Sequence, residues 1–248
     1  MEYFFESSDT IKKGLGFSHF SPLHIMWLLF FVVLTAVLCF VYVRSSERGR
    51  KIIRITLASL TILDEVFKIV GLASHGNYTP SYLPLHLCSI NIFIIAIHAI
   101  KPSKLLSSFL YTVCIPAALA ALLFPTWTKL PLVNFMHIHS FTVHILLAMY
   151  PIMLFVAKEI KPQIKDLPKT FALLFGFALV AFGANCIFDT NFMFLRSASK
   201  GNPLYYFEVA FGNHLIGFPV LIAGIVLVMY LPIVIKEKVK QKRAQTAQ

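Results

Sequence analysis

Cys88 and three histidines are the residues of this chain best suited to covalent chemistry. A cysteine thiol becomes a strong nucleophile when a nearby base takes its proton, and histidine is the usual base. His137, His139 and His144 lie in one apolar stretch, and Cys88 lies in another. This combination indicates an activated thiol, and it leaves open which histidine pairs with Cys88.

Other ionisable and polar residues also lie inside apolar stretches. A charge at the centre of a bilayer costs roughly 2.5–3.5 kcal/mol on insertion scales, so a group of such residues indicates a candidate site. Asp64, Glu65 and Lys68 follow Thr61 at helical spacing, so they share one face, and Lys68 can pair with either carboxylate. The remaining polar residues of this kind are His86, Asn91, Ser140, Asn185, Asp189, Asn213 and His214.

The elements that hold these residues are predicted to be membrane helices. The chain is 58% hydrophobic and 13% charged, with a mean hydropathy of +0.76. Several apolar runs approach the length of about 20 residues that a helix needs to cross a bilayer. We therefore expect an all-α, polytopic membrane protein with seven transmembrane helices, at residues 22–43, 52–73, 83–100, 105–124, 132–157, 170–189 and 213–235.

The positive charges predict the orientation of these helices. Sixteen of the 22 Lys and Arg residues fall in the segments 44–54, 101–104, 158–169 and 236–248. The alternate segments, 1–21, 74–82, 125–131 and 190–212, hold five, together with the acids Glu2, Glu6, Asp9 and Glu208. Cytoplasmic loops carry the excess of positive charge, so the N-terminus is expected outside and the C-terminus inside. The expected domains are an extracytoplasmic segment 1–21, a membrane domain 22–235 and a basic cytoplasmic tail 236–248.

The net charge of +11 is explained by this topology. Basic residues spread over short loops and a tail bind anionic lipids of the inner leaflet, which are one expected partner. No nucleic-acid-binding motif accompanies them, so nucleic acid is not an expected partner. The four cysteines, Cys39, Cys88, Cys114 and Cys186, all fall within predicted spans and form no CxxC pair, so a disulfide framework is not expected.

Depth along the predicted helices bears on the partner of Cys88. A helix that begins at Leu132 places His137 and His144 about 8 and 18 Å inside, on nearly the same face as Ser140. A helix that begins at Leu83 places Cys88 about 8 Å inside, which matches His137 better. Pairing with His144 requires the segment 83–100 to lie deeper or to tilt.

Three kinds of function are compatible with these residues. A thiol enzyme would use Cys88, a histidine and an orienting carboxylate such as Glu65 or Asp189. A metal-dependent hydrolase would need three protein ligands, which His86, His137, His144, His214 and Asp189 could supply, although no HExxH motif is present. A transporter or sensor would use the buried charges as a proton relay or pH switch, since buried acids beside Lys and His serve such roles.

Two sequence blocks resemble a known family. The first is LPLHLC at residues 83–88, and the second is DTNFMFL at residues 189–195, followed by Pro203. With His144 between them, these blocks resemble the YwaF-type integral membrane proteins of bacteria, a family similar to eukaryotic transmembrane protein 164. The resemblance covers residues 20–235, and LPLHLC is its most specific part.

This resemblance implies a seven-helix protein of the bacterial cell membrane that transfers acyl groups between phospholipids. Cys88 would be the nucleophile and His144 the general base, with a phospholipid as substrate and a lysophospholipid or water as acceptor. Asn91 or Ser140 could donate to the oxyanion, and no cofactor or metal is expected. Glu65, His86, Asp189 and Asn191 match polar positions of the bacterial members.

Overall fold

The computed structural model describes residues 3–6, 10–198 and 202–246. Glu2 and Asp9, two of the predicted outer acids, lie outside these ranges. Within them every regular element is helical. The α-helices are α1 (Pro22–Arg44), α2 (Glu47–Ser74), α3 (Leu87–Ile100), α4 (Lys104–Phe109), α5 (Ile115–Leu123), α6 (Phe135–Val156), α7 (Leu167–Phe188), α8 (Pro203–Phe211) and α9 (Gly217–Thr246). The short turns are η1 (Pro80–Tyr82), η2 (Leu110–Cys114, a π-helical turn), η3 (Ile164–Asp166), η4 (Phe192–Phe194) and η5 (His214–Ile216).

Six helical segments among the described residues are long and apolar enough to cross a membrane. They are Pro22–Arg44, Pro80–Ile100, Lys104–Leu123, Phe135–Val156, Ile164–Phe188 and His214–Lys236. Each overlaps a predicted span, so the chain is an all-helical, multi-pass membrane protein. The remaining predicted span coincides with α2, which is helical along its length but carries Asp64, Glu65 and Lys68.

One predicted boundary was wrong in a way that affects the site. The helix expected to begin at Leu83 begins at Leu87 instead, and His86 is its N-cap residue with extended backbone angles. The cause is Pro84, because the residue before a proline is disfavoured in the helical region. Leu83 accordingly has φ −54° and ψ 143°. Residues 83–86, which precede Cys88, therefore lie outside the helix: Leu85 N donates to Leu83 O at 2.7 Å in a tight turn, and His86 has φ −68° and ψ 152°.

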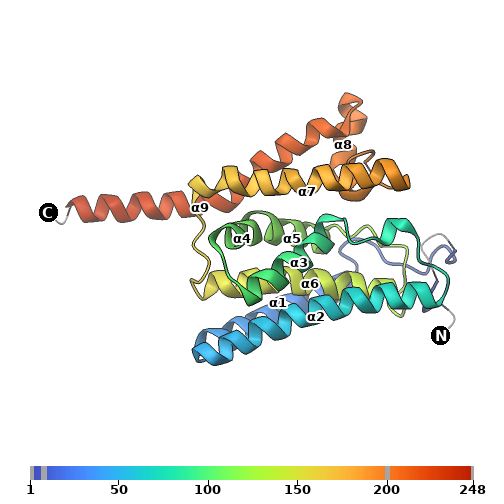
Figure 1. The fold of residues 1–248 in the computed structure, drawn as a ribbon, viewed down its shortest axis with the longest axis horizontal. Coiled ribbons are helices and arrows are strands. Elements are labelled where there is room, and N and C mark those ends of the chain that lie inside the picture. The colour runs from blue at the N-terminus through green and yellow to red at the C-terminus, as the bar shows by residue number, and fades with distance from the viewer. Residues whose placement is uncertain (1–2, 7–9, 199–201, 247–248) are drawn as a thin grey trace. The chain divides into compact units, whose positions relative to one another are not determined.

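Contacts divide the chain into two compact units, Met1–Arg196 and Ser197–Gln248. In the first unit α6 is the central helix, and α1, α2, α3 and α5 all pack against it. Figure 1 shows α1, α2 and α6 running along one another in this unit. Only two residues, Ser45 and Ser46, separate α1 from α2, so these helices form a hairpin, and the Ser46 side chain accepts a hydrogen bond from Gly49 N to cap α2.

The second unit contains α8, η5 and α9, of which the sequence had indicated only α9. Gly217 opens α9 close to α8, and a Cβ atom at this position would meet Phe207 Cδ2 at 2.7 Å and Leu204 Cδ2 at 2.8 Å. A larger residue at this position would therefore force the Phe207 and Leu204 side chains to shift. The helix α9 continues as far as Thr246, so the predicted basic tail is helical over its described residues.

Candidate active site

Cys88 and His144 meet between α3 and α6. His144 Nε2 lies 3.0 Å from Cys88 Sγ, which is within hydrogen-bonding distance. Cys88 is the second residue of α3, whereas His144 lies in the third turn of α6. Cys88 is thus paired with His144, whereas His137 is bound to Trp27, so the depth match to His137 expected from a helix beginning at Leu83 was wrong.

A main-chain carbonyl fixes the tautomer of His144. Its Nδ1 lies 2.6 Å from Ser140 O, and a carbonyl oxygen can only accept a hydrogen bond. Nδ1 therefore carries the proton when the ring is neutral, and the lone pair on Nε2 faces the thiol of Cys88. This orienting group lies one turn earlier on α6 itself. The expectation that a carboxylate of Glu65 or Asp189 orients the base is not met, because a nearer acceptor is already present on the same helix.

Trp127 completes the surroundings of His144, and sequence reasoning missed it. The two rings are stacked, with centroids 5.2 Å apart and planes 14° from parallel. Trp127 Nε1 is buried and has no hydrogen-bond partner among the described residues. Tryptophan near the end of a membrane span is common, so its position alone gave no signal of this contact.

The other two histidines on α6 are engaged elsewhere. His137 Nε2 accepts a hydrogen bond from Trp27 Nε1 at 3.0 Å, and its Nδ1 lies 3.0 Å from Leu130 O. His139 faces α2 instead, with Nδ1 3.3 Å from Asp64 Oδ1 and Nε2 4.0 Å from Glu65 Oε2. Of the three candidates, His144 is the one placed to act on Cys88.

A buried cluster of charges lies beside this pair. Lys68 Nζ donates to Glu65 Oε1 at 2.6 Å, and the two side chains are only 8% and 6% exposed. Lys68 thus pairs with Glu65 rather than with Asp64, whose Oδ2 accepts a hydrogen bond from Thr142 at 3.2 Å. Ser89 Oγ donates to Glu65 Oε1 at 3.4 Å. Because Ser89 follows Cys88, the ion pair is connected to the start of α3.

The two sequence blocks LPLHLC and DTNFMFL pack against each other. Leu83 and Leu85 contact a small core formed by Ala181, Ala184 and Phe192. His86 accepts a hydrogen bond from Met193 N through Nδ1 at 3.4 Å, and its ring lies 5.1 Å from the Phe192 ring. The second block therefore packs against the non-helical residues that precede Cys88.

The remaining predicted residues have structural surroundings of their own. Asp189 is 91% exposed, ends α7 in a left-handed conformation and pairs with Arg196 at 2.5 Å. Asn191 accepts a hydrogen bond from Arg196 N. Asn91, three residues after Cys88, is 1% exposed, and its Oδ1 has no hydrogen-bond partner in the part of the chain that the structure describes. Ser140 enters the site through its carbonyl group.

The ligands proposed for a metal centre do not converge. Among the described residues, no three His, Cys, Asp or Glu side chains are grouped so that they could bind one metal ion. His137 is held by Trp27 and Leu130, and Asp189 pairs with Arg196. The donor set therefore gives no geometric support to the metal-dependent hydrolase.

The fold and the buried polar site define a multi-pass integral membrane protein with a Cys–His pair between two helical segments of membrane-spanning length. The model of the TMEM164 family matches residues 19–235, and the chain belongs to this family. This match confirms the family resemblance inferred from the two sequence blocks. Comparison with curated proteins and with solved structures gave no match.

Proposed function

We propose that this protein transfers or hydrolyses the acyl groups of membrane phospholipids through a covalent acyl-Cys88 intermediate. The observation that supports this function is the arrangement of Cys88, His144 and Ser140. His144 Nε2 is 3.0 Å from the thiol, and its Nδ1 is held by Ser140 O at 2.6 Å. This geometry supplies a nucleophile, a base in the required tautomer and a group that orients the base.

The first half of the reaction forms a thioester. The thiol proton of Cys88 moves to His144 Nε2, and the sulfur attacks the carbonyl carbon of a phospholipid ester. The tetrahedral intermediate collapses with cleavage of the bond between that carbon and the glycerol oxygen. His144 returns its proton to this oxygen, so a lysophospholipid leaves and the acyl group stays on Cys88.

The second half releases the acyl group. The hydroxyl of a lysophospholipid, or a water molecule, gives its proton to His144 and attacks the thioester carbon. The C–S bond breaks, and the Cys88 sulfur takes the proton back from His144. A lysophospholipid acceptor makes the protein an acyltransferase, whereas water makes it a lipase.

The start of α3 can stabilise the oxyanion. The first amide groups of a helix have no acceptor within the helix, and the helix dipole adds partial positive charge there. The earliest helical amide with an acceptor is Ile90 N, which donates to His86 O. The His86 side chain makes no capping bond, so no side-chain cap competes with the intermediate for the first amide groups of α3. Asn91 and Ser140 remain further candidate donors.

The membrane placement that fits this function has seven spans, with α2 as the second. Its charges are then buried against α3 and α6 rather than in lipid, which lowers their cost. The distribution of Lys and Arg supports an N-terminus outside and a C-terminus inside, and the resemblance to the bacterial YwaF-type proteins supports a bacterial cell membrane. In this placement the Cys–His pair lies toward the outer leaflet, and the inner basic loops bind anionic lipid.

Acyl exchange by purified protein in nanodiscs tests the function. The substrate is a phospholipid labelled in its acyl chain, supplied with or without lysophospholipid. We expect turnover in the wild type, loss of it in Cys88→Ala and His144→Ala, and a labelled thioester on Cys88 that hydroxylamine releases. Cys39→Ala is the matched control because Cys39 lies on α1. Labelled acyl-enzyme that persists in Cys88→Ala would contradict the assignment.

The buried charge cluster favours one alternative, a transporter or sensor. Asp64, Glu65, Lys68 and His139 form a group of the kind that proton relays use. Uptake of a ligand into proteoliposomes that depends on Asp64 but not on Cys88 would support this alternative. The absence of any acyl turnover in nanodiscs would favour it as well.

A further inference from the structure

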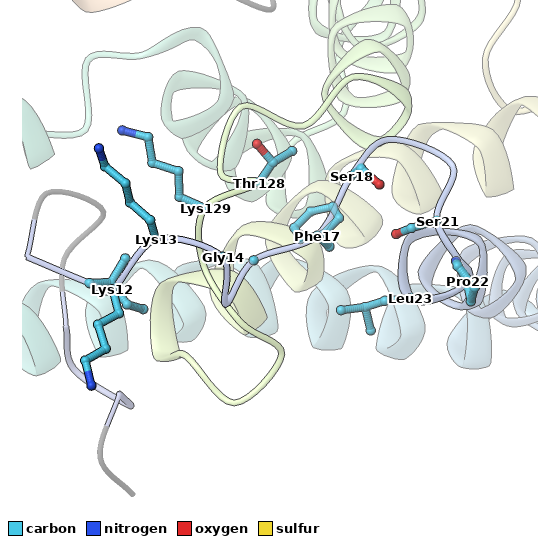
Figure 2. A pocket seen from close by; sticks show the side chains of 12 residues that line it. Lys12, Lys13, Gly14, Phe17, Ser18, Ser21, Pro22, Leu23, Thr128 and Lys129 are labelled. Atoms are coloured by element: carbon cyan, nitrogen blue, oxygen red, sulfur yellow. The ribbon is translucent and has the colours of Figure 1, made fainter.

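An open groove lies where the N-terminal segment meets the loop before α6. Its volume is about 920 Å³, and it is lined by residues 11–14, 16–18 and 21–23 together with Thr128 and Lys129. These segments lead directly into α1 and α6, so the groove lies at the end of the bundle where both helices begin. Figure 2 shows the two segments facing each other across it.

The groove is cationic and rich in hydroxyl groups. Lys12, Lys13 and Lys129 line it, and no acidic residue is part of its described lining. Lys13 and Lys129 extend in the same direction beside Thr128, whereas Lys12 extends the other way (Figure 2). Ser21 Oγ, also in the lining, is buried and has no hydrogen-bond partner among the described residues. These are the donors that a phosphate group requires.

The two walls of the groove are held together firmly. Phe17 N donates to Thr128 O at 2.8 Å. A Cβ atom at position 16 would lie 2.0 Å from Thr128 O, so only glycine allows the segments to approach this closely. The Phe17 ring packs against the rings of His137 and Phe141, at 5.1 and 5.8 Å. The groove wall is therefore anchored on aromatic side chains of α6.

One wall is continuous with the candidate active site. Trp127, which stacks on His144, is directly followed by Thr128 and Lys129 in the groove lining. A lipid whose phosphate lies at Lys129 would thus have its glycerol esters near the loop that covers the base. Both α1 and α6 are long and apolar enough to span a bilayer, so their starts are expected at the level of the lipid headgroups.

We propose that this groove binds the phosphodiester of an anionic membrane phospholipid and thereby selects the substrate of the Cys88 reaction. Lys13 and Lys129 contact the phosphate oxygens, Lys12 adds long-range attraction, and the Ser21 and Thr128 hydroxyls supply hydrogen bonds. This inference rests on the proposed function for the role of the lipid as a substrate. The binding site itself does not depend on turnover.

Binding of soluble lipid to the Cys88→Ala protein in phosphatidylcholine nanodiscs tests the site without turnover. The probes are dihexanoyl phosphatidylglycerol, dihexanoyl phosphatidylcholine and inorganic phosphate, measured by calorimetry. We expect the phosphatidylglycerol probe to bind more tightly than the phosphatidylcholine probe. The double variant Lys13→Gln/Lys129→Gln should weaken phosphatidylglycerol binding on the order of tenfold, because each basic residue near the headgroups attracts anionic lipid. The control Arg196→Gln removes a basic side chain that pairs with Asp189 and is not part of the groove lining, and it should bind like the wild type.

Two results would overturn the proposal. Equal binding by the Lys13/Lys129 variant and the wild type would exclude the groove. If inorganic phosphate binds as tightly as phosphatidylglycerol and displaces it, the groove is a site for free anions and not for lipid.

Turnover separates this proposal from the proposed function. In the protein with Cys88 intact, the Lys13/Lys129 variant should raise KM for phosphatidylglycerol with kcat little changed. Turnover that needs Cys88 but has an unchanged KM in this variant would reject the groove and keep the enzyme. Lipid binding that needs the lysines, without any turnover, would keep the groove and reject the enzyme.

Discussion

Trp127 and His144 are stacked although they lie in different elements, one in the loop before α6 and the other in its third turn. The ring planes are 14° from parallel, and the centroids are 5.2 Å apart. Ser140 O holds the same imidazole from within the helix at 2.6 Å. The orientation of His144 toward Cys88 is therefore set jointly by α6 and by the loop that precedes it.

Replacing Trp127 should slow acyl transfer. An aromatic face next to a ring that becomes positively charged stabilises it by about 0.5–2 kcal/mol, and this charge forms when His144 takes the thiol proton. We expect Trp127→Ala to lower kcat on the order of tenfold, and Trp127→Phe to retain part of the rate. The measurement is the acyl-exchange rate in nanodiscs.

Trp27→Phe is the control for that experiment. Trp27 donates to His137 at 3.0 Å, so its loss removes a partly buried hydrogen bond without touching the Cys–His pair. It should lower thermal stability more than kcat. A Trp127→Ala protein with the kcat of the wild type would show that the stacked ring has no part in the reaction.

The reactivity of Cys88 provides a test that needs no substrate. Only the thiolate reacts with an alkylating reagent, and His144 is the group placed to accept the proton. We predict that His144→Gln slows labelling of Cys88 by lipid-soluble N-ethylmaleimide about tenfold, as followed by peptide mass spectrometry. His137→Gln should leave the rate unchanged, since His137 is bound to Trp27 and Leu130. Equal labelling of Cys88 in all three proteins would reject the thiol–imidazole pair.

The buried ion pair between Glu65 and Lys68 should be costly to break from one side. Removing one partner leaves an uncompensated buried charge, with a cost on the order of 3 kcal/mol. Glu65→Gln and Lys68→Met should therefore each lower the unfolding temperature, and the double variant should recover part of the loss. Thermal unfolding in detergent measures all three.

A variant of Ser89 tests whether the ion pair between Glu65 and Lys68 positions Cys88. Ser89 Oγ donates to Glu65 Oε1, and Ser89 adjoins Cys88. Ser89→Ala should lower kcat only slightly while the protein stays folded. Single variants as stable as the wild type would mean that the ion pair between Glu65 and Lys68 does not stabilise the protein.

The apolar spans could be predicted from the sequence because run length and hydropathy determine them directly. Six predicted spans coincide with membrane-length helical segments, and the polar stripe on 52–73 falls on one helix, α2. The start of α3 was placed too early because Leu83, Leu85 and Leu87 continue the apolar pattern ahead of the helix. Pro84 was the available signal that the helix begins later.

The composition of the site was predictable, but its contacts were not. Cys88 and His144 could be selected by residue type and by resemblance, yet their approach depends on the tertiary path of residues 83–86. The Trp127 stack and the Ser140 carbonyl carry no sequence signal, because any residue has a carbonyl and tryptophan is common at span ends. Asp189 was selected for its charge, but it is exposed and pairs with Arg196.

A second polar network, at the other end of α6, should affect stability and not catalysis. Glu159, just after α6, accepts hydrogen bonds from Tyr42 at 2.9 Å, Arg54 at 2.8 Å and Arg50 at 3.3 Å. It thereby joins the end of α6 to the α1–α2 hairpin. His144 lies about 18 Å from the end of α6 at Val156, so the reaction should not sense this change.

Glu159→Gln should lower the free energy of unfolding by roughly 1–2 kcal/mol, a value reduced for the partial exposure of these side chains. The matched control is Asp166→Asn, whose partner Lys104 is 59% exposed, and its effect should be smaller. The measurements are the unfolding temperature and kcat on the same samples. A loss of kcat in Glu159→Gln at temperatures where the protein stays folded would mean that the two ends of α6 are coupled, because removing this network leaves every contact of Cys88 and His144 in place.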